Sequence, residues 1–237
     1  MGLIGNIDKN DILKDIIVSI KENIMVLKEN FGRIRAILSK IKNFRRGFPL
    51  LVNVKELKRV QKKALLFLEK ELDGKDEIGD YLEFGVCHSS SLLCMYQTMG
   101  NLNLNTPRLF GFDSFQGLPE NDLWQENQDN RGWRPGQFYA EMGTMKKYLT
   151  KHKVNWTRTK LIKGWYKDTL TQQLKDEFQI SKASIIMIGC DIYTATKEAL
   201  DFCKSLIKDV TMIVFDDWNS GDLASKGRGE KKILMNF

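Results

Sequence analysis

The stretch Tyr81-Leu82-Glu83-Phe84-Gly85-Val86-Cys87-His88-Ser89-Ser90-Ser91 constrains the fold more than any other part of the sequence. Its apolar first half is typical of a buried strand, and its small, polar second half predicts a turn into a helix at residues 92–99. Gly85 lets a ligand approach the backbone, and the serine run can cap the helix. An open α/β sheet holds a nucleotide-like cofactor at such a turn. Taken alone, a plain strand-turn-helix is an equal alternative, because a dinucleotide fingerprint has three glycines.

Strands and helices alternate along the rest of the chain. We expect strands at 81–86, 108–113, 160–165, 183–191 and 211–217, and helices at 54–72, 145–152, 169–178 and 194–207. This alternation predicts an α/β fold with a doubly wound, mostly parallel, Rossmann-like sheet. We assign residues 76–237 to this domain and residues 1–75 to an N-terminal helical segment. Residues 120–160 are polar and rich in tryptophan, which favours a lid that faces the substrate.

The positive charge of the chain is concentrated at the N-terminus. The net charge is +7, but residues 1–70 hold 16 Lys and Arg against 7 Asp and Glu, so the remainder is slightly acidic. A nucleic-acid-binding face on the core domain is therefore not expected. Apolar residues recur at helical spacing from Ile12 to Ile41, and this segment could pack on the core, pair with a second subunit or lie on an anionic membrane. We favour packing or homo-oligomer formation over peripheral membrane contact.

The four cysteines suggest a reducing compartment. No two of them form a CxxC pair, and the sequence shows neither a signal peptide nor an apolar run long enough to span a bilayer. We expect reduced thiols and a cytoplasmic location.

Acidic residues end three of the expected strands. Asp113 is the last residue of the second strand, where a carboxylate can accept hydrogen bonds from both hydroxyls of a ribose, although it could instead cap the turn at 114–119. Asp191, Asp216 and Asp217 end the fourth and fifth strands and would lie close together if those strands are neighbours. Three such carboxylates repel one another unless a cation binds them. Oxygen ligands suit Mg²⁺, with Ca²⁺ and Mn²⁺ as alternatives, and do not suit zinc. As a structural alternative, these aspartates could cap the following helices, which explains one or two of the three but less easily all of them.

Five ordered motifs between about residues 78 and 232 resemble the macrocin O-methyltransferase (TylF-like) family, which are S-adenosylmethionine (SAM)-dependent enzymes that methylate sugar hydroxyls. The motifs are Glu83-Phe84-Gly85-Val86, Phe110-Gly111-Phe112-Asp113-Ser114-Phe115-x-Gly117-Leu118-Pro119-Glu120, Lys163-Gly164-Trp165-Tyr166-x-Asp168-Thr169-Leu170, Cys190-Asp191-Ile192-Tyr193-x-Ala195-Thr196-Lys197-x-Ala199-Leu200 and Phe215-Asp216-Asp217-Trp218.

The resemblance implies a SAM- and Mg²⁺-dependent O-methyltransferase that acts on a glycosylated small molecule. Glu83 and Gly85 would line the methionine end of SAM, Asp113 would hold the ribose, and Gly164 and Trp165 would lie near the adenine. Asp191, Asp216 and Asp217 would bind Mg²⁺, with Asp191 also the catalytic base. We expect the cofactor site to include Val86, His88, Ser90, Ser91 and Ser114 from the adjoining turns as well.

Two departures from the family pattern keep alternatives open. Cys87-His88-Ser89-Ser90 stands where the family commonly has glycines, and the C-terminal strands of the family are apparently missing after Lys232. A non-catalytic interaction protein with a methyltransferase-like fold is one alternative. An NAD-linked oxidoreductase is another, although the G-x-G-x-x-G fingerprint is absent.

Overall fold

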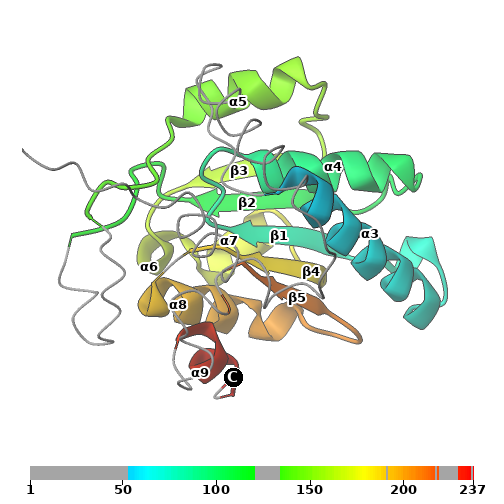
Figure 1. Cartoon of the computed structure of the whole chain (residues 1–237). Helices are drawn as coiled ribbons and strands as arrows, with labels where there is room; N and C mark the ends of the chain where they lie inside the picture. The colour runs from blue at the N-terminus through cyan, green and yellow to red at the C-terminus, as the bar shows by residue number, and fades with distance from the viewer. Residues whose placement is uncertain (1–52, 121–133, 191, 217, 219–228, 236) are drawn as a thin grey trace, which may run out of the picture.

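The computed structural model describes residues 53–120, 134–190, 192–216, 218, 229–235 and 237 (Figure 1). The predicted amphipathic segment, and the candidate metal ligands Asp191 and Asp217, lie outside these residues.

Five strands of the described chain form one parallel sheet in the order β3-β2-β1-β4-β5. They are β1 (Asp80–Phe84), β2 (Leu109–Asp113), β3 (Thr159–Lys163), β4 (Ala183–Ile188) and β5 (Met212–Phe215). The chain runs outward from β1 in one direction through β2 and β3, and in the other through β4 and β5. The predicted doubly wound α/β sheet is confirmed, and its topological switch point lies between β1 and β4, where such folds bind ligands.

Most of the described helices occupy positions that hydrophobic periodicity predicts, but those at 166–169 and 229–235 were not predicted. The helices are α3 (Val54–Glu71), α4 (Ser90–Asn101), α5 (Met142–Lys151), α6 (Tyr166–Thr169), α7 (Gln172–Glu177), α8 (Tyr193–Cys203) and α9 (Gly229–Met235), with 3₁₀ turns η1 (Lys75–Glu77) and η4 (Lys204–Leu206). The single helix expected at 169–178 is two short helices instead. A new N-cap separates them, because the Thr171 hydroxyl accepts the N–H of Leu174 at 3.2 Å.

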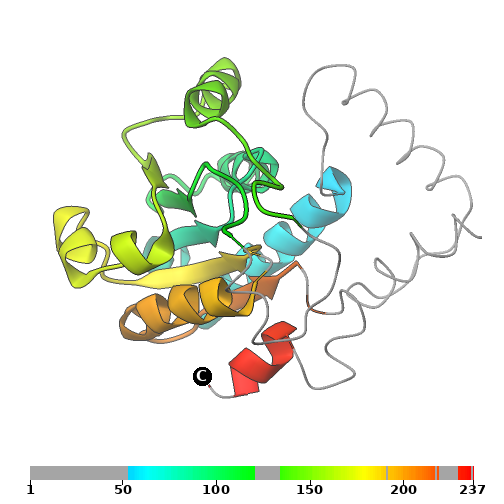
Figure 2. The same cartoon turned by 90° about the vertical axis from the view of Figure 1, so that its left-hand side faces the viewer.

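Helices cover both faces of the sheet, as Figure 2 shows with α3 and α4 on one side and α8 on the other. Successive strand residues point to opposite faces. Tyr81 therefore packs with Leu65 and Leu68 of α3 and with α4, whereas Phe84 packs with Phe202 of α8. Burying each such side chain contributes about 1.5 to 3 kcal/mol, so these two layers supply most of the driving force for the fold.

Helix α3 belongs to the core of the sheet domain, although the sequence assigned it to the N-terminal segment. Leu65 and Leu68 have no exposed surface, and Lys58 Nζ donates to Gln97 Oε1 of α4 at 2.6 Å. The helix begins where Asn53 accepts the N–H of Glu56. Residues 1–52 lie outside the described ranges, so a separate N-terminal segment stays a prediction.

Two predictions about composition can be compared with the described residues. All four cysteines are described, and none forms a disulfide; Cys94, Cys190 and Cys203 are buried, and Cys87 is partly exposed. Among the helices of the described ranges, none has the length and apolar character needed to cross a bilayer.

Candidate functional site

A cavity of about 700 Å³ opens at the carboxyl ends of the strands. Its volume lies within the range of small-molecule sites, roughly 300 to 1,000 Å³. Of the predicted cofactor residues, Gly85, Val86, His88, Ser90, Ser91, Asp113, Ser114, Gly164 and Trp165 line it. Nine residues chosen from three separate parts of the sequence thus meet in one cavity.

The turn after β1 forms one wall of the cavity and depends on close backbone contact. Gly85 has φ +90°, and a Cβ placed there would lie 2.0 Å from the carbonyl oxygen of Gly189, which follows β4. Only glycine allows this approach. Cys87 (φ 42°) and Ser89 (φ 59°) also adopt left-handed conformations, which side chains disfavour. The turn therefore places a cysteine and a serine in left-handed conformations that glycine adopts more readily.

Asp113 ties the turn after β1 to the turn after β2. Its Oδ2 accepts the N–H of Cys87 at 2.8 Å, and its Oδ1 accepts the N–H of Phe115 at 2.7 Å. Burial raises the pKa of the Asp113 carboxyl, and these N–H donors oppose that rise. Asp113 lines the cavity, as expected for a ribose ligand, and it also caps the turn after β2, which was the structural alternative. Both roles are open to it, since each carboxylate oxygen has a second lone pair.

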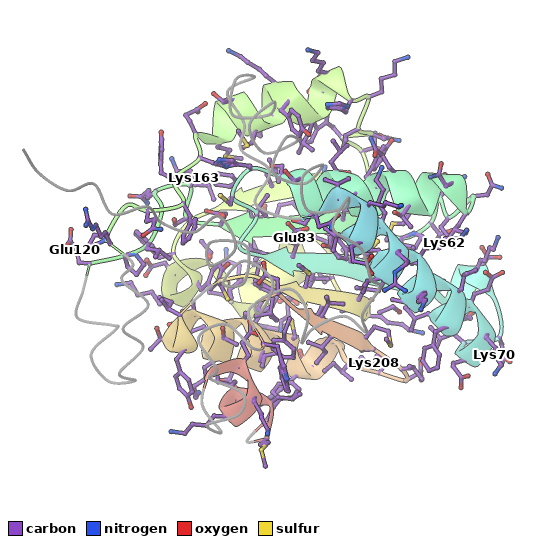
Figure 3. The ribbon with its side chains drawn as sticks, viewed as in Figure 1. Lys62, Lys70, Glu83, Glu120, Lys163 and Lys208 are labelled. Atoms are coloured by element: carbon purple, nitrogen blue, oxygen red, sulfur yellow. The ribbon has the colours of Figure 1, made fainter. Side chains whose placement is uncertain are left out.

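Glu83 lies beneath the cavity and not on its wall, which corrects the sequence expectation. The side chain has no exposed surface and is absent from the cavity lining. Figure 3 labels Glu83 near the middle of the molecule, by β1. The Glu83 carboxylate accepts the hydroxyl of Tyr81 at 2.5 Å and that of Ser91 in the first turn of α4. Because strand residues alternate in direction, Glu83 points with Tyr81 toward the helix that covers the sheet. Glu83 therefore contacts Ser91, which lines the cavity, and does not itself reach the cavity wall.

His88 and Cys87 lie side by side at the cavity wall. The Cys87 Sγ is 3.2 Å from His88 Nδ1 and donates to the carbonyl oxygen of Phe138 at 3.2 Å. Burial lowers the pKa of the His88 imidazole, and the charge of Asp113 opposes this. A neutral imidazole at pH 7 is consistent with a binding contact that carries no fixed charge.

Residues 164–166 form the wall beyond β2 and β3. The Gly164 N–H donates to the carbonyl oxygen of Asp113 at 3.0 Å, which extends the strand pairing to the cavity edge. A Cβ at Gly164 would lie 2.3 Å from Thr169 Cγ2, so a side chain there would collide with α6. Tyr166 donates its hydroxyl to the Phe112 carbonyl oxygen at 3.2 Å and fixes the start of that helix. Trp165, just before it, is held at the cavity edge.

Of the three predicted metal ligands, the structure places Asp216. Strand β4 pairs with β5, so the predicted neighbourhood of their carboxyl ends is confirmed. Asp216 lines the cavity, and its Oδ2 would lie 3.1 Å from a Cβ at Gly189. Among the described residues no three His, Cys, Asp or Glu side chains gather as a metal site. The predicted Mg²⁺ site requires Asp191 and Asp217, which are not described, so it stays a prediction.

The sequence matches the family model for macrocin O-methyltransferase (TylF) over residues 59–227, which is well over half of the chain. The chain belongs to the macrocin O-methyltransferase family. It is accordingly an O-methyltransferase. The matched range contains all five strands and every predicted site residue.

Solved structures of other methyltransferases share the fold of this family member. The O-methyltransferase NovP is 17% identical, with a TM-score of 0.58 over 71% of this chain and 69% of NovP. The calicheamicin methyltransferase CalS11 is 18% identical, with a TM-score of 0.59 over 89% of this chain and 85% of CalS11. An apo structure of CalS11, described as TDP-rhamnose 3'-O-methyltransferase, is 17% identical in sequence, with a TM-score of 0.51 over 89% of this chain and 86% of CalS11. No curated protein matches the sequence significantly.

Several cavity residues were not among the predicted site residues. Cys87 lies in the turn after β1, and Gly189 and Cys190 directly follow β4, so their position near strand ends could have identified them. Phe138 lies in a segment that no motif covers, and its contact with Cys87 joins residues 51 positions apart. The other unpredicted lining residues are Gly117, Leu118, Pro119, Glu120, Tyr166, Lys167, Ile192, Thr194, Ala195 and Glu198.

Proposed function

We propose that the protein transfers a methyl group from SAM to a hydroxyl of a sugar in a glycosylated small molecule, with the help of Mg²⁺. The observation that carries the proposal is the cavity itself: in a member of an O-methyltransferase family, nine predicted cofactor residues line one cavity at the switch point of a parallel sheet.

The charge of the cavity supports SAM over a dinucleotide. Asp113, Glu120, Glu198 and Asp216 line it, against Lys167 as the one lysine or arginine of the described lining. SAM carries a positively charged sulfonium, which an acidic cavity attracts, whereas the diphosphate of NAD is repelled.

The sugar acceptor is supported by the names of the structural neighbours. CalS11 is called a calicheamicin methyltransferase and a TDP-rhamnose 3'-O-methyltransferase, so its acceptor is a sugar. A cavity of about 700 Å³ leaves room for part of an acceptor beside a cofactor.

In this proposal the residues of the chain bind and orient the reactants. The turn at 85–91 would present backbone to the methionine end of SAM, Asp113 would accept a ribose hydroxyl with its remaining lone pairs, and Trp165 would lie near the adenine; all of them line the cavity. SAM supplies an electrophilic methyl group, and Mg²⁺ would lower the proton affinity of the acceptor hydroxyl. Asp216 would help to hold Mg²⁺ together with Asp191 and Asp217, and Asp191 would take the hydroxyl proton.

Calorimetric titration with SAM and NADH, followed by a transfer assay with methyl-labelled SAM, tests the proposal. The acceptor panel contains neutral glycosides, amino-sugar glycosides and TDP-sugars. We expect SAM to bind, NADH not to bind, and label to appear on a glycoside. Binding of NADH without SAM, or binding of neither, overturns the proposal. SAM binding with no transfer to any sugar overturns the acceptor class and favours the non-catalytic alternative.

A further inference from the structure

Ser91 of α4 is held from two sides at the point where it lines the cavity. Its hydroxyl donates to Oε1 of Glu83 on β1, and its carbonyl oxygen accepts Nε2 of Gln61 on α3 at 3.2 Å. Glu83 is fully buried, and Gln61 is 2% exposed. The first turn of α4 is thus fixed to the sheet on one side and to α3 on the other.

The donors around Glu83 suit an ionised carboxylate. The hydroxyls of Tyr81 and Ser91 donate to different oxygens of the group, and the N–H of Leu92 is a further donor. An ionised carboxylate only accepts, so it satisfies all three. A protonated carboxyl carries an O–H that needs an acceptor, and one of the two hydroxyls would have to turn away to provide it.

We propose that Glu83 is a positioning residue that sets the affinity for SAM through Ser91, and that its ionised form holds the first turn of α4 in the geometry that binds SAM. The inference rests on the proposed function, since SAM is the ligand of that cavity. Gln61 supports the same turn by a contact that does not titrate.

The surroundings of Glu83 place its titration near neutral pH. Burial raises its pKa to about 7, opposed by the hydroxyls of Ser91 and Tyr81, and the charge of Asp113 on β2 raises it further. Beyond these groups, Cys94 of α4 and Tyr166 of α6 interact electrostatically with Glu83. Lys58 of α3 and Asp216 after β5 interact with the neighbours of Glu83, namely Cys94 and Tyr81 respectively.

The direction of the pH effect follows from linkage. If SAM binds the ionised form better, its affinity rises as pH increases through about 7, and binding releases a proton from Glu83. The positive charge of SAM acts in the same direction, because a nearby cation favours the carboxylate.

Glu83→Gln tests the inference, because it keeps the shape of the side chain and removes the titration. SAM dissociation constants are measured by calorimetry at pH 6, 7 and 8. From pH 6 to pH 8 the dissociation constant should fall in the wild-type protein, and this fall should be about tenfold larger than in Glu83→Gln. The comparison between the two proteins cancels the titration of SAM itself. Glu177→Gln, an exposed glutamate on α7, is the matched control and should behave as wild type.

Two further variants separate positioning from other causes. Gln61→Met removes the support from α3 and should weaken SAM binding at every pH while keeping the wild-type pH profile. His88→Asn should also keep the rise in SAM affinity between pH 7 and 8, because burial lowers the pKa of His88 and places its titration below that range. A rise that disappears in His88→Asn and persists in Glu83→Gln overturns the inference.

Amide hydrogen exchange of the ligand-free protein supplies a readout that does not depend on SAM. The amide of Leu93, which donates to the Ser89 carbonyl oxygen in the first turn of α4, should exchange faster at pH 8 in Glu83→Gln and Ser91→Ala than in wild type. Unchanged exchange together with an unchanged pH profile of SAM binding overturns the inference. Absence of SAM binding in the wild-type protein at all three pH values instead overturns the proposed function.

Discussion

The carboxylate of Asp113 accepts the backbone N–H of Cys87 at 2.8 Å, and this bond joins the turns that follow β1 and β2. Its second oxygen holds the N–H of Phe115. A residue expected to bind a ribose is thus also a cross-link between two walls of the cavity. Its substitution should affect both ligand affinity and local structure.

Asp113→Ala should weaken SAM binding at least about tenfold and lower the free energy of unfolding by about 2 kcal/mol, because two N–H groups lose a charged acceptor. Calorimetry and urea denaturation measure the two effects.

Arg108→Ala is the control at the opposite end of β2. Arg108 donates through Nη2 to Asp80 Oδ2 at 2.6 Å, and removing it leaves a buried carboxylate without this partner. The control should lose about 3 kcal/mol of stability and none of the affinity. A folded Asp113→Ala protein with wild-type affinity would remove Asp113 from the site.

The sequence predicted the sheet because its evidence is periodic and local. Four of the five described strands are mainly apolar, β3 being the exception, and a small or acidic residue such as Gly85, Asp113 or Gly164 ends or follows each strand. Parallel strands bring such ends to one edge, so most of the cavity lining followed from the fold class. The four-residue helix α6 and its separation from α7 were missed, although Thr171 is a recognisable cap.

The error at Glu83 has a physical cause that alternation along the strand could have revealed. A motif position suggested contact with a ligand, but Glu83 is two residues from Tyr81 and therefore shares its face beneath α4. The cavity lies beyond the end of the strand and not over its face. Phe138 was unpredictable for a different reason, since its place at the cavity depends on a contact with a residue far away in the sequence.

The stability of the protein should depend on pH through Glu83. Burial raises the pKa of Glu83 from 4.5 to about 7, so its contribution is complete below pH 4.5 and is lost as pH rises to about 7. Glu83→Gln cannot titrate and lacks this loss. Between pH 5 and 8, the free energy of unfolding should fall by about 2 to 3 kcal/mol more in the wild-type protein than in the variant, as measured by urea denaturation. Parallel stability profiles in the two proteins would contradict the assignment of a raised pKa to this group.

Ser89→Gly should stabilise the protein, which is unusual for a buried position. Ser89 has φ 59°, is fully buried, and its hydroxyl is without a hydrogen-bond partner. Glycine relieves the backbone strain and removes the unpaired hydroxyl, but it adds entropy to the unfolded chain. The net gain should be about 1 kcal/mol by thermal or urea denaturation. Ser90→Gly, one residue later and inside α4, should lose up to about 1 kcal/mol. Equal losses in both variants would show that the left-handed conformation at Ser89 is not strained.

Mg²⁺ dependence is the prediction that concerns the reaction most directly. Asp216 lies at the end of β5 beside β4, and Asp191 follows β4 in the sequence, so their charges and that of Asp217 come from adjacent strand ends. Carboxylates gathered at one edge raise one another's pKa unless a cation is bound. We therefore expect methyl transfer to a glycoside to stop in EDTA and to return when Mg²⁺ is added in excess.

The three aspartates should differ in what their substitution changes. Asp216→Asn and Asp217→Asn remove one ligand charge each, so they should chiefly raise the Mg²⁺ concentration that gives half-maximal rate. Asp191→Asn should abolish turnover at any Mg²⁺ concentration and leave SAM affinity nearly intact, because its predicted role is to take the proton of the acceptor. Full activity in EDTA would show that the ion is not needed, and Asp191 would then have to act as a base unaided by a cation.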